Sequence, residues 1–130
     1  MFHSRISMKV LLVDDDEALA NVFSTALKKE GFETSIAVTG EEGLQKAESE
    51  KPDLILLDQV LPDIQGNEVL TKLKGKDATK NIPVIILSNF SQEELVKQAM
   101  NEGAQEYIFK FRIDTKDLVN KVKGVLNAAD

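Results

Sequence analysis

Four short apolar runs of the chain each end in polar side chains that could carry out chemistry together. These side chains are Asp14, Asp15 and Asp16 after the first run, Asp58, Ser88 and Lys110 after later ones. Crowded carboxylates repel one another, so they need a nearby cation to stay ionised together near neutral pH. Carboxylate oxygens favour magnesium over softer metals, and a lysine adds a second positive charge.

The same residue types suit the transfer of a phosphoryl group. An aspartate carboxylate is a nucleophile that can form a covalent intermediate with such a group. Phosphoryl transfer depends mainly on positioning and on neutralising charge, which a magnesium ion and a lysine can do together. If these side chains meet, the sequence predicts phosphoryl transfer to an aspartate, with Mg2+ as the cofactor.

Taken singly, each of these residues also has a purely structural explanation. An aspartate after a strand often caps the next helix, and we expect one of Asp14, Asp15 and Asp16 to do so. Ser88 alone would be an ordinary loop hydroxyl, and Lys110 alone a solvated surface charge. The functional interpretation gains weight because four strand ends carry such residues at once.

The spacing of apolar residues predicts five short strands that alternate with five helices. The strands are expected at residues 8–13, 32–38, 53–57, 83–87 and 106–109, with a helix after each. Strands that are apolar on both faces belong in a parallel sheet with helices on each side. With right-handed crossovers this predicts an α/β fold, a doubly wound five-stranded parallel sheet of the flavodoxin-like strand order 2-1-3-4-5.

Such a sheet would bring polar residues from distant parts of the chain to one place. Open parallel sheets bind ligands outside the carboxyl ends of their strands, and all those ends lie along the same edge. We therefore expect at least three carboxylates, a hydroxyl and an ammonium group to converge there. The second run ends in Val38 and Thr39 and contributes nothing comparable, as expected for a strand at the margin.

The composition argues against several classes of protein. The 130 residues are 42% apolar and 29% charged, which fits one globular domain with its own core. A formal net charge of −6 argues against nucleic-acid binding, which needs a clustered basic face. The longest apolar runs are far shorter than the roughly 20 residues needed to cross a bilayer. We expect a soluble, cytoplasmic domain that binds neither nucleic acid nor membrane.

The rare residue types exclude other chemistries. The chain has no cysteine, and its only histidine is His3, which argues against thiol catalysis, a zinc site and histidine acid–base catalysis. No glycine-rich loop follows the first strand, which counts against dinucleotide or flavin-phosphate binding. We expect residues 1–7 to be a leader or remnant and residues 8–130 to be the domain, with Met8 an alternative start.

Four motifs, taken in their order along the chain, resemble those of a known protein family. LLVDDDE at residues 11–17, DLILLDQVLPDIQG at 53–66, VIILSN at 84–89 and EYIFK at 106–110 resemble the CheY-like receiver family of two-component response regulators. Each motif alone is weak, but the ordered set is specific. The resemblance covers the chain from Met8 to its end, so residues 8–130 are expected to form a receiver domain.

The resemblance implies roles for the acidic residues. Asp58 looks like the phosphoacceptor, which also contacts the metal. Asp14 and Asp15 look like the acidic pair that helps to hold Mg2+. Val60 matches the position whose backbone carbonyl binds the metal, so its side chain is free to vary.

The resemblance also implies a switch. Ser88 matches the hydroxyl that turns toward the phosphoryl group, and Lys110 matches the lysine that contacts a phosphoryl oxygen. Tyr107, which alone would be read as a packing residue, matches the switch aromatic. Its rotamer couples phosphorylation to the face formed by the fourth helix, the fifth strand and the fifth helix.

Two departures from the family pattern carry expectations of their own. Phe111 stands where a proline usually follows the lysine, so we expect a trans peptide bond and a reshaped loop at residues 110–113. Asn89 replaces the small residue usual after the switch hydroxyl.

Val60 and Phe90 are apolar at positions that influence dephosphorylation, and apolar groups position a hydrolytic water poorly. We therefore expect slow self-dephosphorylation.

The leading functional hypothesis is a phosphorylation-dependent signalling switch in a two-component phosphorelay. A sensor histidine kinase or phosphotransfer protein would donate the phosphoryl group to Asp58. An output protein would then bind the face formed by the fourth helix, fifth strand and fifth helix. Such a protein catalyses its own phosphorylation and hydrolysis but is not a metabolic enzyme.

Two alternatives share the same fold. One is a pseudo-receiver, a binding module that is never phosphorylated. The other is an Mg2+-dependent aspartyl phosphatase, which places its nucleophile after the first strand in an Asp-x-Asp pattern. Asp14 and Asp16 have that spacing, but Glu17 and Ala18 lack the expected continuation with small residues, and there is no room for the usual cap domain.

Overall fold

The computed structural model describes residues 7–90 and 92–128. Its strands are β1 (Lys9–Val13), β2 (Glu33–Ala37), β3 (Leu54–Asp58), β4 (Val84–Ser88) and β5 (Glu106–Phe109). Its helices are α1 (Glu17–Lys29), α2 (Gly40–Glu50), α3 (Gly66–Lys74), α4 (Glu93–Asn101) and α5 (Thr115–Ala128), with a short 3-10 helix η1 (Lys110–Arg112) after β5. Residues 1–6 of the predicted leader lie outside the described part, and Ser7 is exposed.

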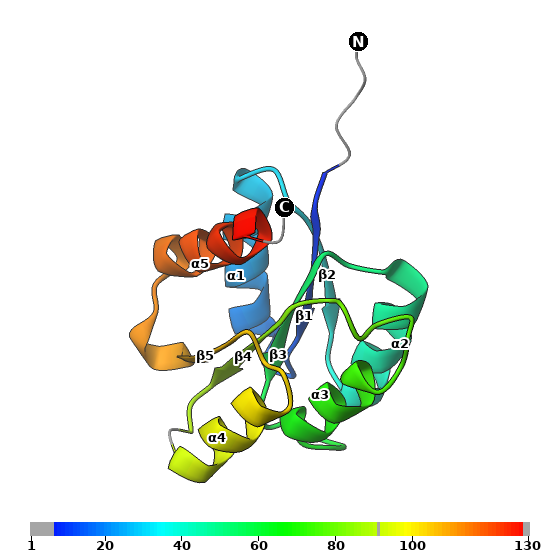
Figure 1. The fold of residues 1–130 in the computed structure, drawn as a ribbon. Coiled ribbons are helices and arrows are strands. Elements are labelled where there is room, and N and C mark those ends of the chain that lie inside the picture. Colours follow the sequence, from blue (N-terminus) through cyan, green and yellow to red (C-terminus); the bar gives the residue numbers. More distant parts are fainter. Residues whose placement is uncertain (1–6, 91, 129–130) are drawn as a thin grey trace.

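Within the described residues, all five strands are parallel and follow the order β2-β1-β3-β4-β5. Helices α1 and α5 lie side by side on one face of the sheet, and α2, α3 and α4 cover the other (Figure 1). The predicted doubly wound α/β fold and its flavodoxin-like strand order are therefore confirmed.

The core consists of two apolar clusters, one on each face of the sheet. Along β3, Leu54 and Leu56 pack with Phe23 of α1 and Leu118 of α5. Their neighbours on β3 point the other way, since successive side chains of a strand alternate between faces. They pack against α2 and α3 instead. This two-sided burial is the reason that the central strands are continuous apolar runs.

The starts of α1 and α2 are capped by side chains that the sequence marks. Asp16 Oδ1 accepts a hydrogen bond from Leu19 N at 3.1 Å, so Asp16 is the aspartate of the acidic triplet that caps a helix. Thr39 Oγ1 accepts from Glu42 N at 3.0 Å. Glu42 in turn accepts from Val38 N at 2.8 Å, one residue earlier than in the usual capping box.

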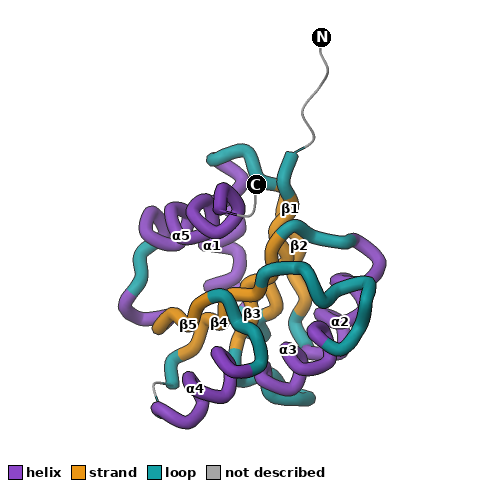
Figure 2. Tube along the Cα trace, in the orientation of Figure 1, coloured by secondary structure: helices purple, strands orange, loops and turns teal. Residues whose placement is uncertain are grey.

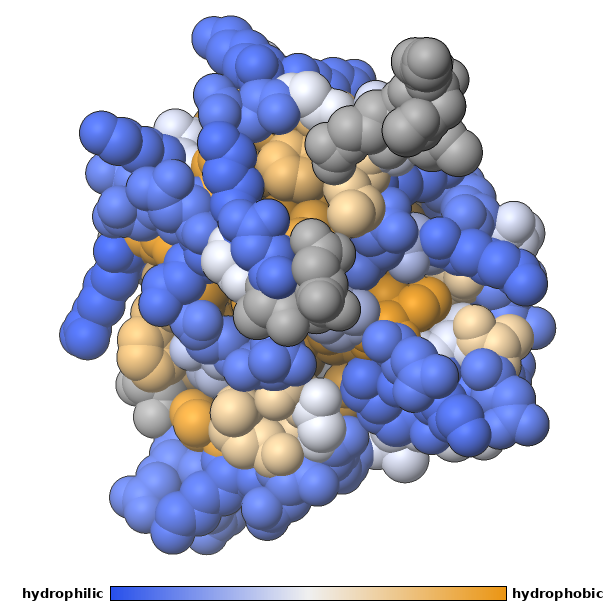
Figure 3. Space-filling model, turned by 45° about the horizontal axis from the view of Figure 1, so that its top comes forward, coloured by the Kyte–Doolittle hydropathy of each residue, from blue (hydrophilic) through white to orange (hydrophobic). Residues whose placement is uncertain are grey.

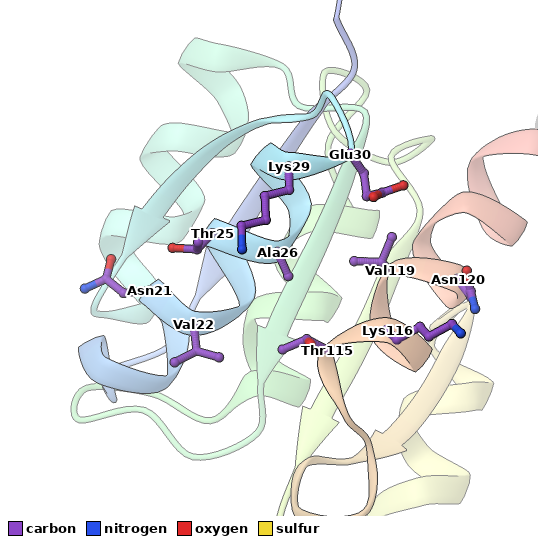
Figure 4. Close-up of a pocket in the computed structure, with 10 residues that line it drawn as sticks. All are labelled: Asn21, Val22, Thr25, Ala26, Lys29, Glu30, Thr115, Lys116, Val119 and Asn120. Atoms are coloured by element: carbon purple, nitrogen blue, oxygen red, sulfur yellow. The ribbon is translucent and has the colours of Figure 1, made fainter.

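The surface is mostly hydrophilic on the side shown in Figure 3, where apolar side chains show only in limited areas. No helix in the described ranges combines the length and apolar character needed to cross a membrane. A groove of about 680 Å³ runs between α1 and α5 (Figure 4). Its lining residues are Asn21, Val22, Thr25, Ala26, Lys29, Glu30, Thr115, Lys116, Val119 and Asn120. None of them is one of the polar residues at the strand ends.

Candidate functional site at the carboxyl edge of the sheet

The register of the sheet brings the first and third strand ends together. Val13 of β1 pairs with Leu57 of β3, so the next residues, Asp14 and Asp58, are neighbours at the edge. The backbone N–H of Asp14 donates to Ala37 O at 2.9 Å and so ties this edge to the end of β2. Loops, drawn in teal in Figure 2, connect each of these strands to the helices that cover the sheet.

Lys110 joins the two carboxylates. It follows β5, and its Nζ lies 2.8 Å from Asp14 Oδ2 and 3.2 Å from Asp58 Oδ2. All three residues are buried, and the side chain of Lys110 is only 4% exposed. Asp14 is held in place on its other side because its Oδ1 accepts from Asp16 N at 3.0 Å. The structure therefore assembles a buried acid–lysine cluster from three separate strand ends.

Burial decides the ionisation of Asp58. Loss of solvent raises the pKa of its carboxyl, the ammonium of Lys110 lowers it, and the charge of Asp14 raises it, so that the net pKa rises from 3.8 to about 6. For Lys110, burial lowers the pKa, but the hydrogen bond to Asp14 and the charges of both carboxylates outweigh it, so the net pKa is raised. Lys110 therefore keeps its proton, and Asp58 is the group whose ionisation is costly.

The site contains the type of ligands that bind hard metal cations. Asp14, Asp15 and Asp58 each offer a carboxylate oxygen, and these oxygens lie within 4.8 Å of one another. Asp15 is exposed, so this corner of the cluster opens to solvent. Three carboxylates against one ammonium leave an excess of negative charge, which a divalent cation would neutralise. All-oxygen ligands with room for water fit magnesium.

The loop after β3 is closed at its base. Val60 and Gln65 form an antiparallel bridge, and Gly66 N donates to Gln59 O at 2.7 Å. A Cβ atom on Gly66 would overlap the carbonyl oxygen of Asp58 and lie 2.8 Å from Gln59 Cα, so this close approach requires glycine. Val60 is 50% exposed, and it is its backbone that pairs with Gln65 within the loop.

Ser88 and Tyr107 both contact the backbone of Phe90. Ser88 is fully buried, one residue beyond the Leu87 that pairs with Asp58, and its Oγ accepts from Phe90 N at 2.9 Å. Tyr107 Oη donates to Phe90 O at 3.0 Å. Among the described residues Ser88 makes no hydrogen bond to the acid–lysine cluster. Both predicted switch residues thus hold one peptide segment of the loop between β4 and α4.

The chain from Lys110 to Arg112 forms the 3-10 helix η1. No peptide bond in the described ranges is cis, which confirms the trans bond expected with Phe111 in place of proline. The Arg112 guanidinium lies 5.6 Å from the centre of the Phe109 ring, an arrangement that favours a cation–π contact. Lys110 therefore begins this helical turn, and its side chain contacts Asp14 and Asp58.

Two residues of the site region were missed by sequence reasoning. Gln59 follows Asp58 directly and is 2% exposed, yet neither polar atom of its amide has a hydrogen-bond partner within the described part of the chain. Asp63, in the same loop, contacts the start of α2. No local pattern marks either residue, because the burial of Gln59 and the partners of Asp63 come from elements distant in sequence.

Comparison with known proteins gives a consistent answer. A family model described as the response regulator receiver domain matches residues 10–123. The chain is 32% identical over 122 residues to the DNA-binding dual master transcriptional regulator RpaA of Synechocystis, covering 94% of this chain and 50% of that protein. It is 31% identical over 121 residues to the phosphate regulon transcriptional regulatory protein PhoB of Rhizobium meliloti, covering 93% and 53%. The chain spans about half the length of these curated relatives.

Solved structures with the same fold are also similar in sequence. A CheY-like response regulator receiver domain protein from Methanospirillum hungatei superposes with a TM-score of 0.89 and 34% identity, covering 95% of this chain and 96% of the other. A CheX–CheY complex with BeF3 and magnesium from Borrelia burgdorferi matches with a TM-score of 0.84 and 30% identity, covering 92% and 90%. The similarity therefore extends over nearly the whole domain in both directions.

Proposed function

The chain belongs to the response regulator receiver domain family, whose members act in phosphorylation-dependent two-component signalling, and we propose that Asp58 is its phosphoacceptor. One observation carries the proposal: the buried Asp58 carboxylate lies 3.2 Å from Lys110 and beside two further acids. A sensor histidine kinase or a phosphotransfer protein is the proposed donor.

The proposed reaction gives Asp58, Lys110 and Asp14 different roles in the transfer step. An oxygen of Asp58 attacks phosphorus, a P–O bond forms, and the P–N bond of the donor phosphohistidine breaks, with the electron pair going to the imidazole nitrogen. Lys110 offers its ammonium to a phosphoryl oxygen as charge shifts onto the site. Asp14 keeps that ammonium aimed at the edge of the sheet through its 2.8 Å contact.

Mg2+ is the proposed cofactor of this step. Asp14, Asp15, Asp58 and the backbone carbonyl of Val60 would hold it. When bound, it would neutralise charge on the transferring phosphoryl oxygens. The relative from Borrelia burgdorferi was solved with BeF3 and magnesium, which supports the same ligand chemistry here.

The output side of the proposal involves Ser88 and Tyr107. In the structure both hold the backbone of Phe90. We propose that Ser88 turns from Phe90 N–H to the phosphoryl group, which frees this segment and changes the rotamer of Tyr107. The α4–β5–α5 face would then bind an output protein.

The proposed receiver unit is residues 8–130, and the interpretation of residues 1–7 as a leader or remnant stays a prediction. The family match from residue 10 and the start of β1 at Lys9 support the start of the receiver unit. The net charge of −6 supports a domain that does not itself bind nucleic acid, although curated relatives are named as DNA-binding regulators. A cytoplasmic location stays a prediction.

Intact mass after incubation with acetyl phosphate and Mg2+ tests the phosphoacceptor. We expect one added phosphoryl group on the wild type and none on Asp58→Asn or in the presence of EDTA. An unmodified wild type would favour the pseudo-receiver alternative. Modification that persists in Asp58→Asn would place the acceptor elsewhere. The aspartyl phosphatase alternative has less support, since Asp16 is exposed and caps α1.

Self-dephosphorylation is proposed to be slow. The exposed residues Val60 and Phe90 line one small cavity with Gln59, Gln65, Gln92 and Leu95, and the two apolar side chains offer no hydrogen bond to orient a hydrolytic water. Asn89, which replaces a small residue, is exposed in the same loop. We expect Val60→Asn to speed the loss of the phosphoryl group, timed by intact mass after removal of the donor. An unchanged lifetime would count against the idea.

A further inference from the structure

The loop between β3 and α3, residues 59–65, is attached at its tip to a different part of the chain. Asp63 Oδ1 accepts a hydrogen bond from Gly40 N at 2.8 Å, and Asp63 Oδ2 accepts from Glu41 N at 2.9 Å. These two donors are the first helical residues of α2. One exposed carboxylate therefore binds two backbone groups of a helix that precedes it in the sequence.

The contact is tight and carries charge. A Cβ atom on Gly40 would lie 2.5 Å from Ile64 Cγ1 and 3.0 Å from Val69 Cγ2, so the start of α2 packs directly on the loop and on α3. The backbone N–H groups of Glu41 and Gly40 hold the pKa of Asp63 below its usual range. The carboxylate is thus ionised at the positive end of the α2 dipole.

The same loop is fastened at its base beside the phosphoacceptor. The Val60–Gln65 bridge and the 2.7 Å hydrogen bond from Gly66 N to Gln59 O close the loop next to Asp58. Only residues 61–64 separate the two bridged residues, so a shift at the tip of so short a loop is passed on to Val60 and Gln65. The position of Asp63 is therefore coupled to the position of Val60 and, through Gln59, to that of Asp58.

We propose that Asp63 is a positioning residue for the metal and phosphoryl site, because it fixes the loop of residues 59–65 against α2. Within the described part of the chain, Asp63 makes no side-chain hydrogen bond or ion pair with the acids or with Lys110, so it would act through the backbone of Val60. This inference rests on the proposed function, in which that backbone helps to hold Mg2+. Residues that orient metal ligands typically change metal affinity about 10–100-fold when they are replaced.

The simpler explanation is that Asp63 only caps α2. Thr39 provides a matched control because it also caps α2. Its hydroxyl accepts a hydrogen bond from Glu42 N at 3.0 Å, and that bond does not involve the loop after β3. Asp63→Ala and Thr39→Ala each remove a cap from the same helix end. Both variants should therefore lower the melting temperature, but only Asp63→Ala should change the metal site.

The experiment measures Mg2+ binding by titration calorimetry and, separately, the Mg2+ concentration for half-maximal phosphorylation by acetyl phosphate. We expect Asp63→Ala to weaken Mg2+ binding about tenfold, the low end for such residues, while saturating Mg2+ restores most of the rate. Thr39→Ala should bind Mg2+ as the wild type does. Asp63→Asn keeps one acceptor oxygen and should lie between, which covers the case that Asp63→Ala fails to fold.

The outcomes separate this inference from the proposed function. Equal Mg2+ affinities for wild type and Asp63→Ala, or equal losses in Asp63→Ala and Thr39→Ala, would overturn the role of Asp63 while leaving Asp58 as the acceptor. A wild type that binds Mg2+ but takes no phosphoryl group would overturn the proposed function, and the calorimetric comparison would still decide on Asp63. A wild type without Mg2+ affinity would overturn both.

Discussion

The buried cluster around Lys110 and the exposed ion pair on α4 use the same chemical groups at the same separation. Lys110 Nζ lies 2.8 Å from Asp14 Oδ2, and Lys97 Nζ lies 2.9 Å from Glu93 Oε1. The side chain of Lys110 is 4% exposed, whereas that of Lys97 is 69% exposed. Distance alone therefore does not distinguish the two pairs, but solvent does.

The difference lies in desolvation. Water screens the exposed pair, and such pairs contribute only about 0–1 kcal/mol to stability. The buried charges have lost their water, and their attraction offsets that loss only in part. The raised pKa of Asp58 is the sign of this unrelieved cost. A domain that keeps such a cluster at the edge of its sheet holds groups suited to receive an incoming cation or phosphoryl group.

Replacing Lys110 should give the largest effect. Lys110→Met keeps the length of the side chain but removes the cation that contacts both Asp14 and Asp58. We expect the initial rate of phosphorylation by acetyl phosphate to fall about 100-fold or more, as for the loss of one group that stabilises transition-state charge. Lys97→Met, which removes an equally close but exposed pair, should leave the rate unchanged. Equal rates in the two variants would contradict the conclusion that burial distinguishes the Lys110 contacts from the exposed Lys97 pair.

The second prediction concerns pH in the absence of metal. The folded protein binds the Asp58 proton more tightly than the unfolded chain, because burial raises the folded pKa from 3.8 to about 6. The contribution of Asp58 to stability is therefore full at low pH and is lost as the pH rises through this window. Asp58→Asn removes the dependence, so its stability advantage over the wild type should grow from about pH 4 to about pH 7. Urea unfolding in EDTA measures it; an advantage independent of pH would contradict the cause.

An uncharged group extends the comparison. Gln59 is buried beside Asp58, its side-chain amide has no hydrogen-bond partner in the described residues, and an unpaired buried amide costs about 1–3 kcal/mol. Gln59→Leu has a similar volume, and we expect it to raise the free energy of unfolding by about 1 kcal/mol. Chemical denaturation gives the value. A loss of stability would mean that the amide has a partner, such as an ordered water.

The smallest effect is expected at the surface. Glu93→Gln removes the partner of Lys97 on α4, and we expect the free energy of unfolding to change by less than about 0.5 kcal/mol. Added salt should shrink even this difference, because exposed charges are screened. A change as large as that in Gln59→Leu would show that exposure is a poor guide to the energy of these pairs.

The strands and the acid–lysine cluster could be predicted because local patterns determine them. Residues 54–57 are apolar without alternation, which indicates a strand covered on both faces and hence a parallel sheet. Parallel pairing then puts every strand end on one edge, so Asp14, Asp58 and Lys110 had to approach one another. The trans bond before Phe111 followed from the cost of a cis bond without proline.

Other contacts could not be predicted, because they involve residues outside the paired strands, where the register of the sheet does not determine which residues become neighbours. Asp63 lies in a loop and meets Gly40 of α2, 23 positions earlier. Ser88 and Tyr107 share Phe90, although nothing in their own sequence neighbourhoods links them. Even the capping of α1 by Asp16, rather than by Asp14 or Asp15, depended on the direction in which the chain leaves β1.

The sequence by itself determined the order of elements, the parallel sheet and the chemical groups at its edge, because periodicity and residue type act over a few neighbouring positions. Only the tertiary structure decided which charged groups are buried away from solvent and which loop packs against which helix. Those outcomes arise from packing between elements far apart in the chain. The raised pKa of Asp58 and the hydrogen bonds of Asp63 both result from that packing.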